Sequence, residues 1–483
     1  EWYAVGVDME DPYNIYGGLQ DHDSWKGPSN GWAGEIGPAD WVTVGGGDGM
    51  YNCVDPTDSR WVYNGREMGT MWRFDQTTGV QTQITPRRTE KGKDALRFNW
   101  TPPIALSPHN PAIIYTGAQV VFRSLDRGDH WQEISPDLTS DEDAKQHGES
   151  YISYCTLTTL AESPVTPGVI WAGSDDGKVQ VTKDGGATWL DRTAKLAAAG
   201  GPANFWTSRV FPSPHAAGTA FVSKTGWRLD DYRPSLHRTT DYGETWTSIA
   251  GNLPAGRPIN VVVQDRKNPD LLFVGTEWGI YVTLDGGKSW LPFKAGMPSV
   301  KITDMVVHSR ENDLVVATYG RGAYVVDITP LQGMTAAVLD EDVHLFDIEP
   351  ETQRVTSALG NYQLLGDGHL FTPNEPNAVV VNYWLKAKAA GAIKVTVADA
   401  SGAVLAELTG KGDAGLNTVS WGMRAQRPVA GGQRPEGWGG GRLVEPGEYT
   451  VTLEAAGKKI AKKAVVRYRQ GWTVGPTPVV IHQ

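Results

Sequence analysis

DRKNPDLLFVG (residues 265–275) is the stretch that decides the fold of this chain, because versions of it recur through the first two-thirds of the sequence. Each copy starts with a turn rich in Asp, Ser, Asn and Pro and continues into a short apolar strand, such as LLF here. The copies occupy residues 8–18, 55–65, 107–117, 163–173, 213–223, 265–275 and 308–318. Their spacing of 43 to 56 residues is typical of one four-stranded propeller blade. We therefore predict an all-β chain with a seven-bladed β-propeller at residues 1–330.

A second motif, Ser/Thr-x-Asp-x-Gly-x-x-Trp, follows four of these copies and indicates the type of blade. Its Asp accepts hydrogen bonds from turn amides, its Gly permits a positive φ, and its Trp fills the space between sheets. Metal or ligand binding is the alternative for these aspartates, but we favour a folding role in the turn between the third and fourth strands. The residues given this structural Asp-box role are Asp126, Trp131, Asp184, Trp189, Asp241, Trp246, Asp285 and Trp290.

With these motifs, residues 1–330 resemble the bacterial Asp-box (BNR) repeat β-propellers of the sortilin-like and xyloglucanase-type glycosyl-hydrolase-like superfamily. The four Asp-boxes carry the likeness, together with GGLQD (17–21), VGGGDG (44–49), FVGTEWGIYVTLDGGKSW (273–290) and TYGRGAYVVD (318–327). The resemblance implies a seven-bladed Asp-box β-propeller. It does not decide the activity, because that superfamily contains both hydrolases and non-catalytic binders.

The composition favours an exported protein. The chain has 483 residues, with 57 Gly, 19 Trp and a net charge of −11. This charge argues against a nucleic acid or an anionic membrane surface as the main partner. No apolar run approaches the about 18 residues of a membrane span. Because the sequence opens with Glu1 rather than Met, we expect that a signal peptide or an upstream domain has been removed. The predicted location is extracellular, periplasmic or at the cell surface.

The pattern changes after residue 330. Residues 331–375 are predicted to form a linker with a short helix and a strand. Residues 376–470 alternate apolar and polar positions between turns such as DASGA and AAGKK, which predicts a small antiparallel β-sandwich that resembles an immunoglobulin-like domain. Residues 471–483 are predicted to be a C-terminal tail.

The loops of the propeller that vary between blades are where we expect function. They connect the second and third strands of each blade and link successive blades, so they share one face, and variable loops on a rigid scaffold commonly carry binding sites. Tryptophan faces stack on sugar rings, and carboxylates supply acid and base chemistry. The candidate catalytic residues are Asp21 and Asp48. The candidate ligand-binding residues are Trp25, Trp100, Asp175, Asp176, Arg228, Glu277, Trp278 and Arg321.

Two functions from different classes remain open. The first is a binding propeller that recognises a glycan or an extended polypeptide, or that serves as a subunit of an extracellular assembly. The second is a glycoside hydrolase, because xyloglucanase-type enzymes carry a catalytic aspartate in the loop that matches Asp21. In those enzymes the paired carboxylates come from two propellers, whereas this chain has one, so an upstream propeller or companion chain would have to supply the second. We therefore favour binding, with no cofactor, and no histidine spacing indicates a metal.

Two further expectations concern strands. Cys53 and Cys155 are placed on innermost strands of different blades, which predicts two buried free thiols, with one disulfide as the alternative. The last blade shows only two strands and part of a third after residue 308. We expect residues 1–7, or a segment from further upstream, to complete it.

Overall fold

The computed structural model describes residues 1–31, 34–88, 92–146, 152–294, 296–354, 370–426 and 441–470. The chain divides into two compact units. The first comprises Glu1–Ser29 and Ala39–Gln332, and the second comprises Asn30–Pro38 and Gly333–Gln483. The regular structure of both units is almost entirely β-strand, which confirms the all-β prediction.

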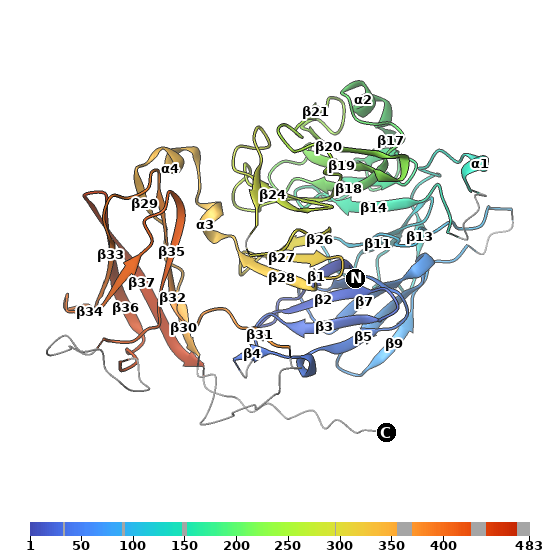
Figure 1. The fold of residues 1–483 in the computed structure, drawn as a ribbon. Helices are drawn as coiled ribbons and strands as arrows, with labels where there is room; N and C mark the ends of the chain where they lie inside the picture. The colour runs from blue at the N-terminus through green and yellow to red at the C-terminus, as the bar shows by residue number, and fades with distance from the viewer. Residues whose placement is uncertain are drawn as a thin grey trace. The chain divides into compact units, whose positions relative to one another are not determined.

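The described part of the first unit holds six four-stranded antiparallel sheets and one three-stranded sheet, in chain order (Figure 1). The first three sheets contain β1 (Trp2–Val7), β2 (Asn14–Leu19), β3 (Ser24–Pro28) and β5 (Val42–Gly45); β6 (Gly49–Val54), β7 (Trp61–Arg66), β8 (Met71–Asp75) and β9 (Val80–Gln83); and β10 (Ile104–Leu106), β11 (Ile114–Gly117), β12 (Val121–Ser124) and β13 (Gln132–Glu133).

The fourth and fifth sheets contain β14 (Leu157–Glu162), β15 (Ile170–Ser174), β16 (Val179–Thr182) and β17 (Leu190–Asp191); and β18 (Trp206–Pro212), β19 (Ala220–Gly226), β20 (Asp231–Thr239) and β21 (Thr247–Ser248). The last two contain β22 (Ile259–Gln264), β23 (Leu272–Thr276), β24 (Gly279–Thr283) and β25 (Leu291–Phe293); and β26 (Ile302–Val307), β27 (Asp313–Thr318) and β28 (Ala323–Asp327). Short helical segments are η1 (Pro38–Asp40), η2 (Glu67–Gly69), α1 (Asp143–Gln146), α2 (Thr193–Ala198), η3 (Trp227–Leu229) and α3 (Thr329–Gln332).

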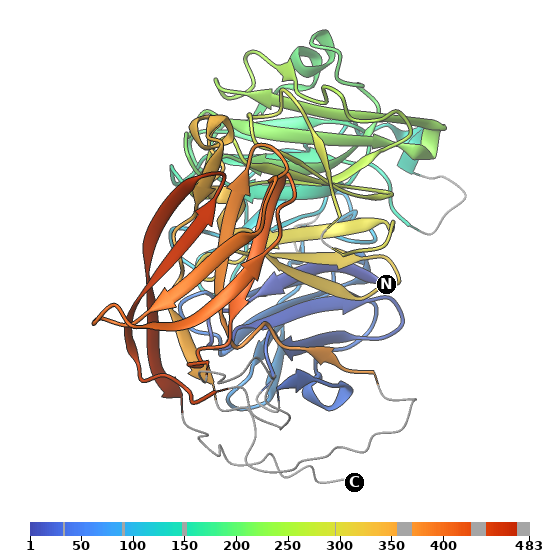
Figure 2. The ribbon, with the colours of Figure 1, turned by 60° about the vertical axis from the view of Figure 1, so that its left-hand side comes forward.

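The sheets follow one another in a closed circuit. The first strand of each sheet lies against the first strand of the next, and β26 of the last sheet lies against β1 (Figures 1 and 2). The Val5 amide donates to Asp304 Oδ2 at 3.1 Å, and the Tyr13 ring stacks on His308 with ring centres 4.1 Å apart. These contacts support a propeller ring, and the number of blades stays a prediction.

The prediction that residues 1–7 complete the last sheet is wrong. They form β1, which pairs with β2 as the innermost strand of its own sheet. The last sheet has three strands in the described residues, and the chain leaves it at α3.

The four predicted Asp-box turns share one hydrogen-bond pattern. In each turn the Asp carboxylate accepts the amide four residues ahead, as in Ser289 N–H to Asp285 Oδ1 at 2.9 Å. The hydroxyl two residues before the Asp accepts the amide of the turn glycine, as in Gly287 N–H to Thr283 Oγ1 at 3.0 Å. These bonds occupy the aspartates within their own turns.

The tryptophans of these turns tie neighbouring sheets together. The indole N–H groups of Trp131, Trp189 and Trp290 donate to backbone carbonyls of the preceding sheet region, at 2.6, 2.8 and 2.8 Å respectively. Trp246 differs, because its indole N–H donates to Gly243 within its own turn at 3.1 Å. Its ring still packs edge-on against the buried Trp171, with centres 6.0 Å apart.

Both cysteines are free thiols in the structure. Cys53 lies on the innermost strand β6, as predicted. Cys155 is buried but lies in the connection before β14, so its predicted place on a strand is wrong.

The second unit is a sandwich with one shared apolar core. Its three-stranded sheet has the order β29 (Val343–Leu345), β32 (Val379–Leu385), β35 (Gly415–Trp421). Its five-stranded sheet has the order β30 (Glu351–Arg354), β37 (Lys458–Gln470), β36 (Gly447–Ala455), β33 (Ile393–Ala398), β34 (Val404–Gly410). Residues such as Val381, Tyr383, Val395 and Val451 fill the core between them.

The segment predicted as a linker belongs largely to this sandwich. After α4 (Ala336–Asp340) it contributes β29 and β30, and β30 pairs parallel to β37, so the sandwich is not purely antiparallel. Residues 30–38 also belong to this unit: β4 (Glu35–Ile36) pairs with β31 (Thr372–Pro373). The predicted tail at 471–483 lies outside the described residues.

Candidate functional site

The loop face is the face of the propeller unit that carries the connections between second and third strands and between successive sheets. An open cavity of about 440 Å³ lies on it. Connections of the first three sheets form its wall, which brings the predicted residues Asp21, Asp48 and Trp100 together. The full lining is Asp21, Asp23, Gly47, Asp48, Glu67, Met68 and Trp100.

Tight turns place these side chains. Asp21, Asp23 and Met68 adopt the left-handed backbone region, with φ of 58°, 64° and 52°. Asp is one of the few residues that enter this region readily, whereas an exposed Met held there is unusual. Met68 occupies η2, directly after β7, and its side chain is exposed at the cavity. The turns therefore present side chains to the cavity at a cost in backbone strain.

Hydrogen bonds divide the four carboxylates into two kinds. Asp48 Oδ1 accepts the Asp21 amide at 2.7 Å, and Glu67 Oε2 accepts the Asp48 amide at 3.1 Å. Asp48 and Glu67 thus hold the loops of the first two sheets together. The carboxylates of Asp21 and Asp23 accept no hydrogen bond from any described residue, so their oxygens are open to a ligand.

Glu67 and Met68 are site residues that the sequence analysis did not predict. They follow β7 at the place where Gln20 and Asp21 follow β2, because both pairs are the second and third residues after a copy of the repeat. Applying the same count to the second copy, at 55–65, would have located them. Trp25, by contrast, does not line the cavity: its indole N–H donates to the His22 carbonyl at 2.5 Å.

Trp100 is fixed at the cavity wall by a short hydrogen-bond chain. Its indole N–H donates to the Tyr3 hydroxyl at 3.0 Å, and that hydroxyl donates to Gln20 Oε1 at 2.5 Å. Burial raises the pKa of Tyr3, so the phenol keeps its proton and can serve as donor and acceptor at once. The ring orientation of Trp100 is thereby set by the first strand of the propeller.

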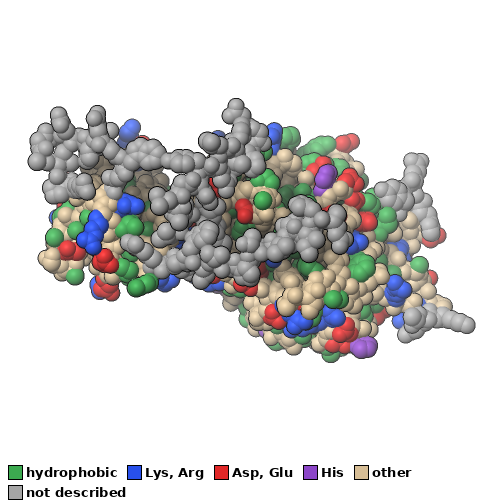
Figure 3. Space-filling model, turned by 90° about the horizontal axis from the view of Figure 1, so that it is seen from below, with side chains coloured by type: hydrophobic (Ala, Val, Ile, Leu, Met, Phe, Trp, Pro, Cys, Tyr) green, Lys and Arg blue, Asp and Glu red, His purple; other side chains and the backbone are tan. Residues whose placement is uncertain are grey.

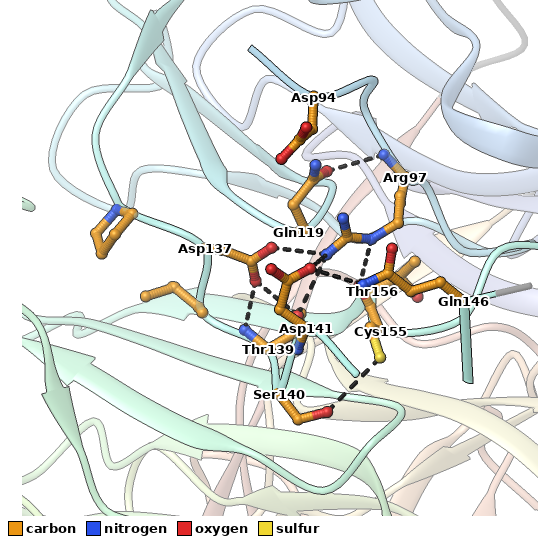
Figure 4. Close-up of polar contacts among 12 residues, drawn as sticks. Asp94, Arg97, Gln119, Asp137, Thr139, Ser140, Asp141, Gln146, Cys155 and Thr156 are labelled. Carbon is orange, nitrogen blue, oxygen red and sulfur yellow. Dashed lines mark hydrogen bonds and ion pairs between the residues drawn. The ribbon is translucent and has the colours of Figure 1, made fainter. Parts of the chain in front are cut away.

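The backbone just before Trp100 is anchored by polar contacts of Arg97 and Asn99. The Arg97 guanidinium contacts Asp137 Oδ2 at 2.6 Å and Asp141 Oδ1 at 3.1 Å. Asn99 Nδ2 donates to Thr156 Oγ1 at 2.8 Å. Figure 4 shows Arg97, from the connection before the third sheet, meeting Asp137 and Asp141 from the connection after it. These contacts hold the segment that leads into Trp100.

A second group of exposed side chains, the aromatic patch, consists of Trp227, Trp278 and Tyr319. Their exposed fractions are 38%, 55% and 48%. Lys301 Nζ lies 5.8 Å from the ring centres of both Trp227 and Tyr319, and 3.2 Å from Glu277 Oε1. These residues come from the same loop face as the cavity, in the last three sheets.

The remaining predicted ligand-binding residues divide between surface and interior. Arg228 in η3 and Arg321 in the turn between β27 and β28 are exposed. Asp175 and Asp176 are buried, with exposed fractions of 1% and 6%, and their carboxylates accept hydrogen bonds from neighbouring loops. The structure thus places these two aspartates behind the surface, where they brace the connection between β15 and β16.

Asp175 gives a pH prediction. Burial raises its pKa to about 7, from an ordinary value of about 3.9, although Thr156 and Asn99 donate to it. The folded state therefore holds the Asp175 proton more tightly than the unfolded state does. The stabilisation that this protonation gives the folded state is fully present below pH 4 and is lost as the pH rises through 7. Relative to wild type, Asp175→Asn should become progressively more stable between pH 4.5 and 7.5, as urea unfolding measures. A difference in unfolding free energy between wild type and Asp175→Asn that stays constant with pH would contradict this prediction.

Neither a metal cluster nor a membrane helix is present among the described residues. In them, no three His, Cys, Asp or Glu side chains are grouped to hold a metal ion, the cavity included. None of the described helices is long and apolar enough to cross a membrane. On the part of the surface drawn in colour in Figure 3, acidic and basic side chains are interspersed, without one large patch of a single sign.

Comparison with solved structures supports a propeller fold. The GH74 xyloglucanase from Xanthomonas campestris matches with a TM-score of 0.50 and 17% identity, over 72% of this chain and 56% of that chain. The GH74 enzyme from Niastella koreensis matches with a TM-score of 0.47 and 13% identity, over 94% and 72%. YCF48 bound to a D1 peptide matches with a TM-score of 0.44 and 12% identity, over 66% and 89%. At such identities the likeness concerns the fold alone. No family model and no curated protein matches the sequence.

Proposed function

We propose that this protein binds an extended glycan on its loop face and does not hydrolyse it. The observation that carries the proposal is the cavity in which the open carboxylates of Asp21 and Asp23 stand beside the fixed ring of Trp100. Carboxylate oxygens accept hydrogen bonds from sugar hydroxyls, and an indole ring packs on the C–H face of a pyranose. The aromatic patch on the same face offers further rings for a longer chain.

Hydrolysis is the second candidate, and the four carboxylates of one cavity are what favours it. A glycosidase needs one carboxyl that donates a proton and another that faces it across the bond, roughly 5–10 Å away. Two of the four, Asp48 and Glu67, already accept backbone amides and hold the loops. Asp21 and Asp23 are then the two carboxylates left for catalysis, and both belong to the same turn of the first sheet instead of facing one another across a cleft. This arrangement supports binding over catalysis.

Location and partners form part of the proposal. An extracellular, periplasmic or cell-surface location suits a polysaccharide ligand. An upstream propeller or companion chain would supply a second wall to the open cavity, as the resemblance to two-propeller enzymes implies. A polypeptide ligand is the other ligand class that aromatic rings and carboxylates accommodate.

The test compares two variants on the same ligand, found by screening the protein on an array of neutral and acidic oligosaccharides. Trp100→Ala should weaken binding about 10–100-fold, because it removes the stacking surface. Asp21→Asn should change affinity less than about threefold, because the amide keeps a hydrogen-bonding carbonyl of the same shape. Isothermal titration calorimetry measures both, with circular dichroism to confirm folding.

The same variants separate the alternatives. Release of reducing ends from a polysaccharide, reduced about 10²–10⁴-fold by Asp21→Asn, would establish a hydrolase. Binding of peptides alone, still dependent on Trp100, would replace the glycan by a polypeptide. Glycan binding unaffected by Trp100→Ala would place the site elsewhere.

A further inference from the structure

Arg228 has an unusual setting on the loop face. It lies in η3, between β19 and β20. Its guanidinium carbon is 4.0 Å from the ring centre of Trp206 and 4.2 Å from that of Trp227. The planar cation therefore lies over two indole rings, and these contacts restrain its orientation.

Stacking leaves the hydrogen-bonding edge of this guanidinium unused. Its N–H donors lie in its plane, pointing outward from the edge. Within the described ranges, no carboxylate or carbonyl oxygen of the protein accepts from them, and the residue is exposed to solvent. A rigid arginine with an open fork is suited to bind a planar anion by two parallel hydrogen bonds.

Two neighbouring basic groups on this face are, in contrast, already paired. Arg233, five residues further on, contacts Asp231 at 2.9 Å. Lys301 contacts Glu277 at 3.2 Å. Glu277 thus has its own cation, and the buried Asp175 accepts hydrogen bonds from Thr156 and Asn99. Both carboxylates attract Arg228 electrostatically, but neither accepts a hydrogen bond from it. Arg228, by contrast, forms no ion pair within the described residues, so its guanidinium is available to an external anion.

We infer that Arg228 binds a carboxylate carried by the glycan, so that the ligand is an acidic polysaccharide containing uronic acid units. This inference rests on the proposed glycan binding and names its ligand class. The exposed Trp227 and Trp278 rings lie in successive loops of the same face, where they can support the sugar whose carboxylate reaches the arginine. Sulfate esters offer a related anion, and the experiment distinguishes them.

The experiment uses a matched pair of probes, tetragalacturonate and its fully methyl-esterified form, which differ in charge but share the sugar backbone. Titration calorimetry with the full chain should show the acid bound roughly 10–100-fold more tightly than the ester. Arg228→Gln should abolish that preference, so that the variant binds the acid and the ester with equal affinity. Arg228→Lys should restore little of it, because an ammonium group lacks the planar fork. Arg233→Gln, an arginine already paired, is the control and should leave the preference intact.

The outcomes separate this inference from the proposed function. Equal affinity of wild type for acid and ester, lost in Trp100→Ala, would overturn the acidic ligand while leaving glycan binding in place. A preference for a sulfated tetrasaccharide over tetragalacturonate would overturn the carboxylate assignment. Binding of oligoglutamate with no binding of any sugar would overturn both the inference and the proposed function. Because the probe pair tests the wild-type protein, a variant that fails to fold does not obscure the result.

Discussion

Asp304→Ala is expected to lower the free energy of unfolding of the propeller unit by about 3–5 kcal/mol, because it leaves a buried arginine without its partner. Asp304 on β26 contacts Arg209 on β18 at 2.5 Å, and both side chains are largely buried. Its second oxygen accepts the Val5 amide of β1 at 3.1 Å. One carboxylate thus joins the innermost strands of three sheets. Urea unfolding followed by tryptophan fluorescence measures the loss.

A double variant provides the control. Arg209→Met with Asp304→Leu replaces both charges by apolar side chains of similar volume, and such replacements are often close to neutral. We expect it to regain the part of the stability that the unpaired arginine costs, while the Val5 amide still lacks its acceptor. A single variant as stable as wild type would mean that water or another group compensates Arg209, and that the ion pair does not tie the strands together.

The fold was predictable from the sequence because packing between neighbouring sheets constrains the last residue of the repeat. Five of the copies end in glycine, and a Cβ atom there would meet the first strand of the next sheet. At Gly173 it would lie 2.4 Å from Thr207 Cγ2, and at Gly275 it would lie 2.6 Å from Ile302 Cγ2. The repeated glycine therefore marks where neighbouring sheets approach most closely. Because this contact between neighbouring sheets recurs around the propeller unit, a glycine repeated along the sequence could predict tertiary structure.

The site was only partly predictable, because the repeat gives the position of a loop but neither the type of residue in it nor the direction of its side chain. Asp21, Asp48 and Trp100 were found by their place in variable loops, and the structure brings them to one cavity. Asp175 was assigned to ligand binding by the same argument, yet its carboxylate is turned inward to Thr156 and Asn99. Loop position indicates the face of the propeller, whereas the direction of a side chain depends on hydrogen bonds to segments distant in sequence.

Gly18→Ala is expected to destabilise the propeller unit by about 3 kcal/mol, toward the upper end of overpacking effects in well-packed interiors. The added Cβ would lie 2.2 Å from the carbonyl carbon of Gly49 and 2.4 Å from the amide nitrogen of Met50. Both are backbone atoms of β6, so relief requires β2 and β6 to separate, which disturbs the packing of the first sheet on the second. Gly65→Ala is the matched control at the same place in the next copy. There the Cβ would meet only the end of the Ile104 side chain at 2.9 Å, which can rotate away, so we expect a loss below about 1 kcal/mol. If Gly18→Ala and Gly65→Ala unfold at the same urea concentration, the close approach of β2 to β6 is not the reason for glycine at position 18.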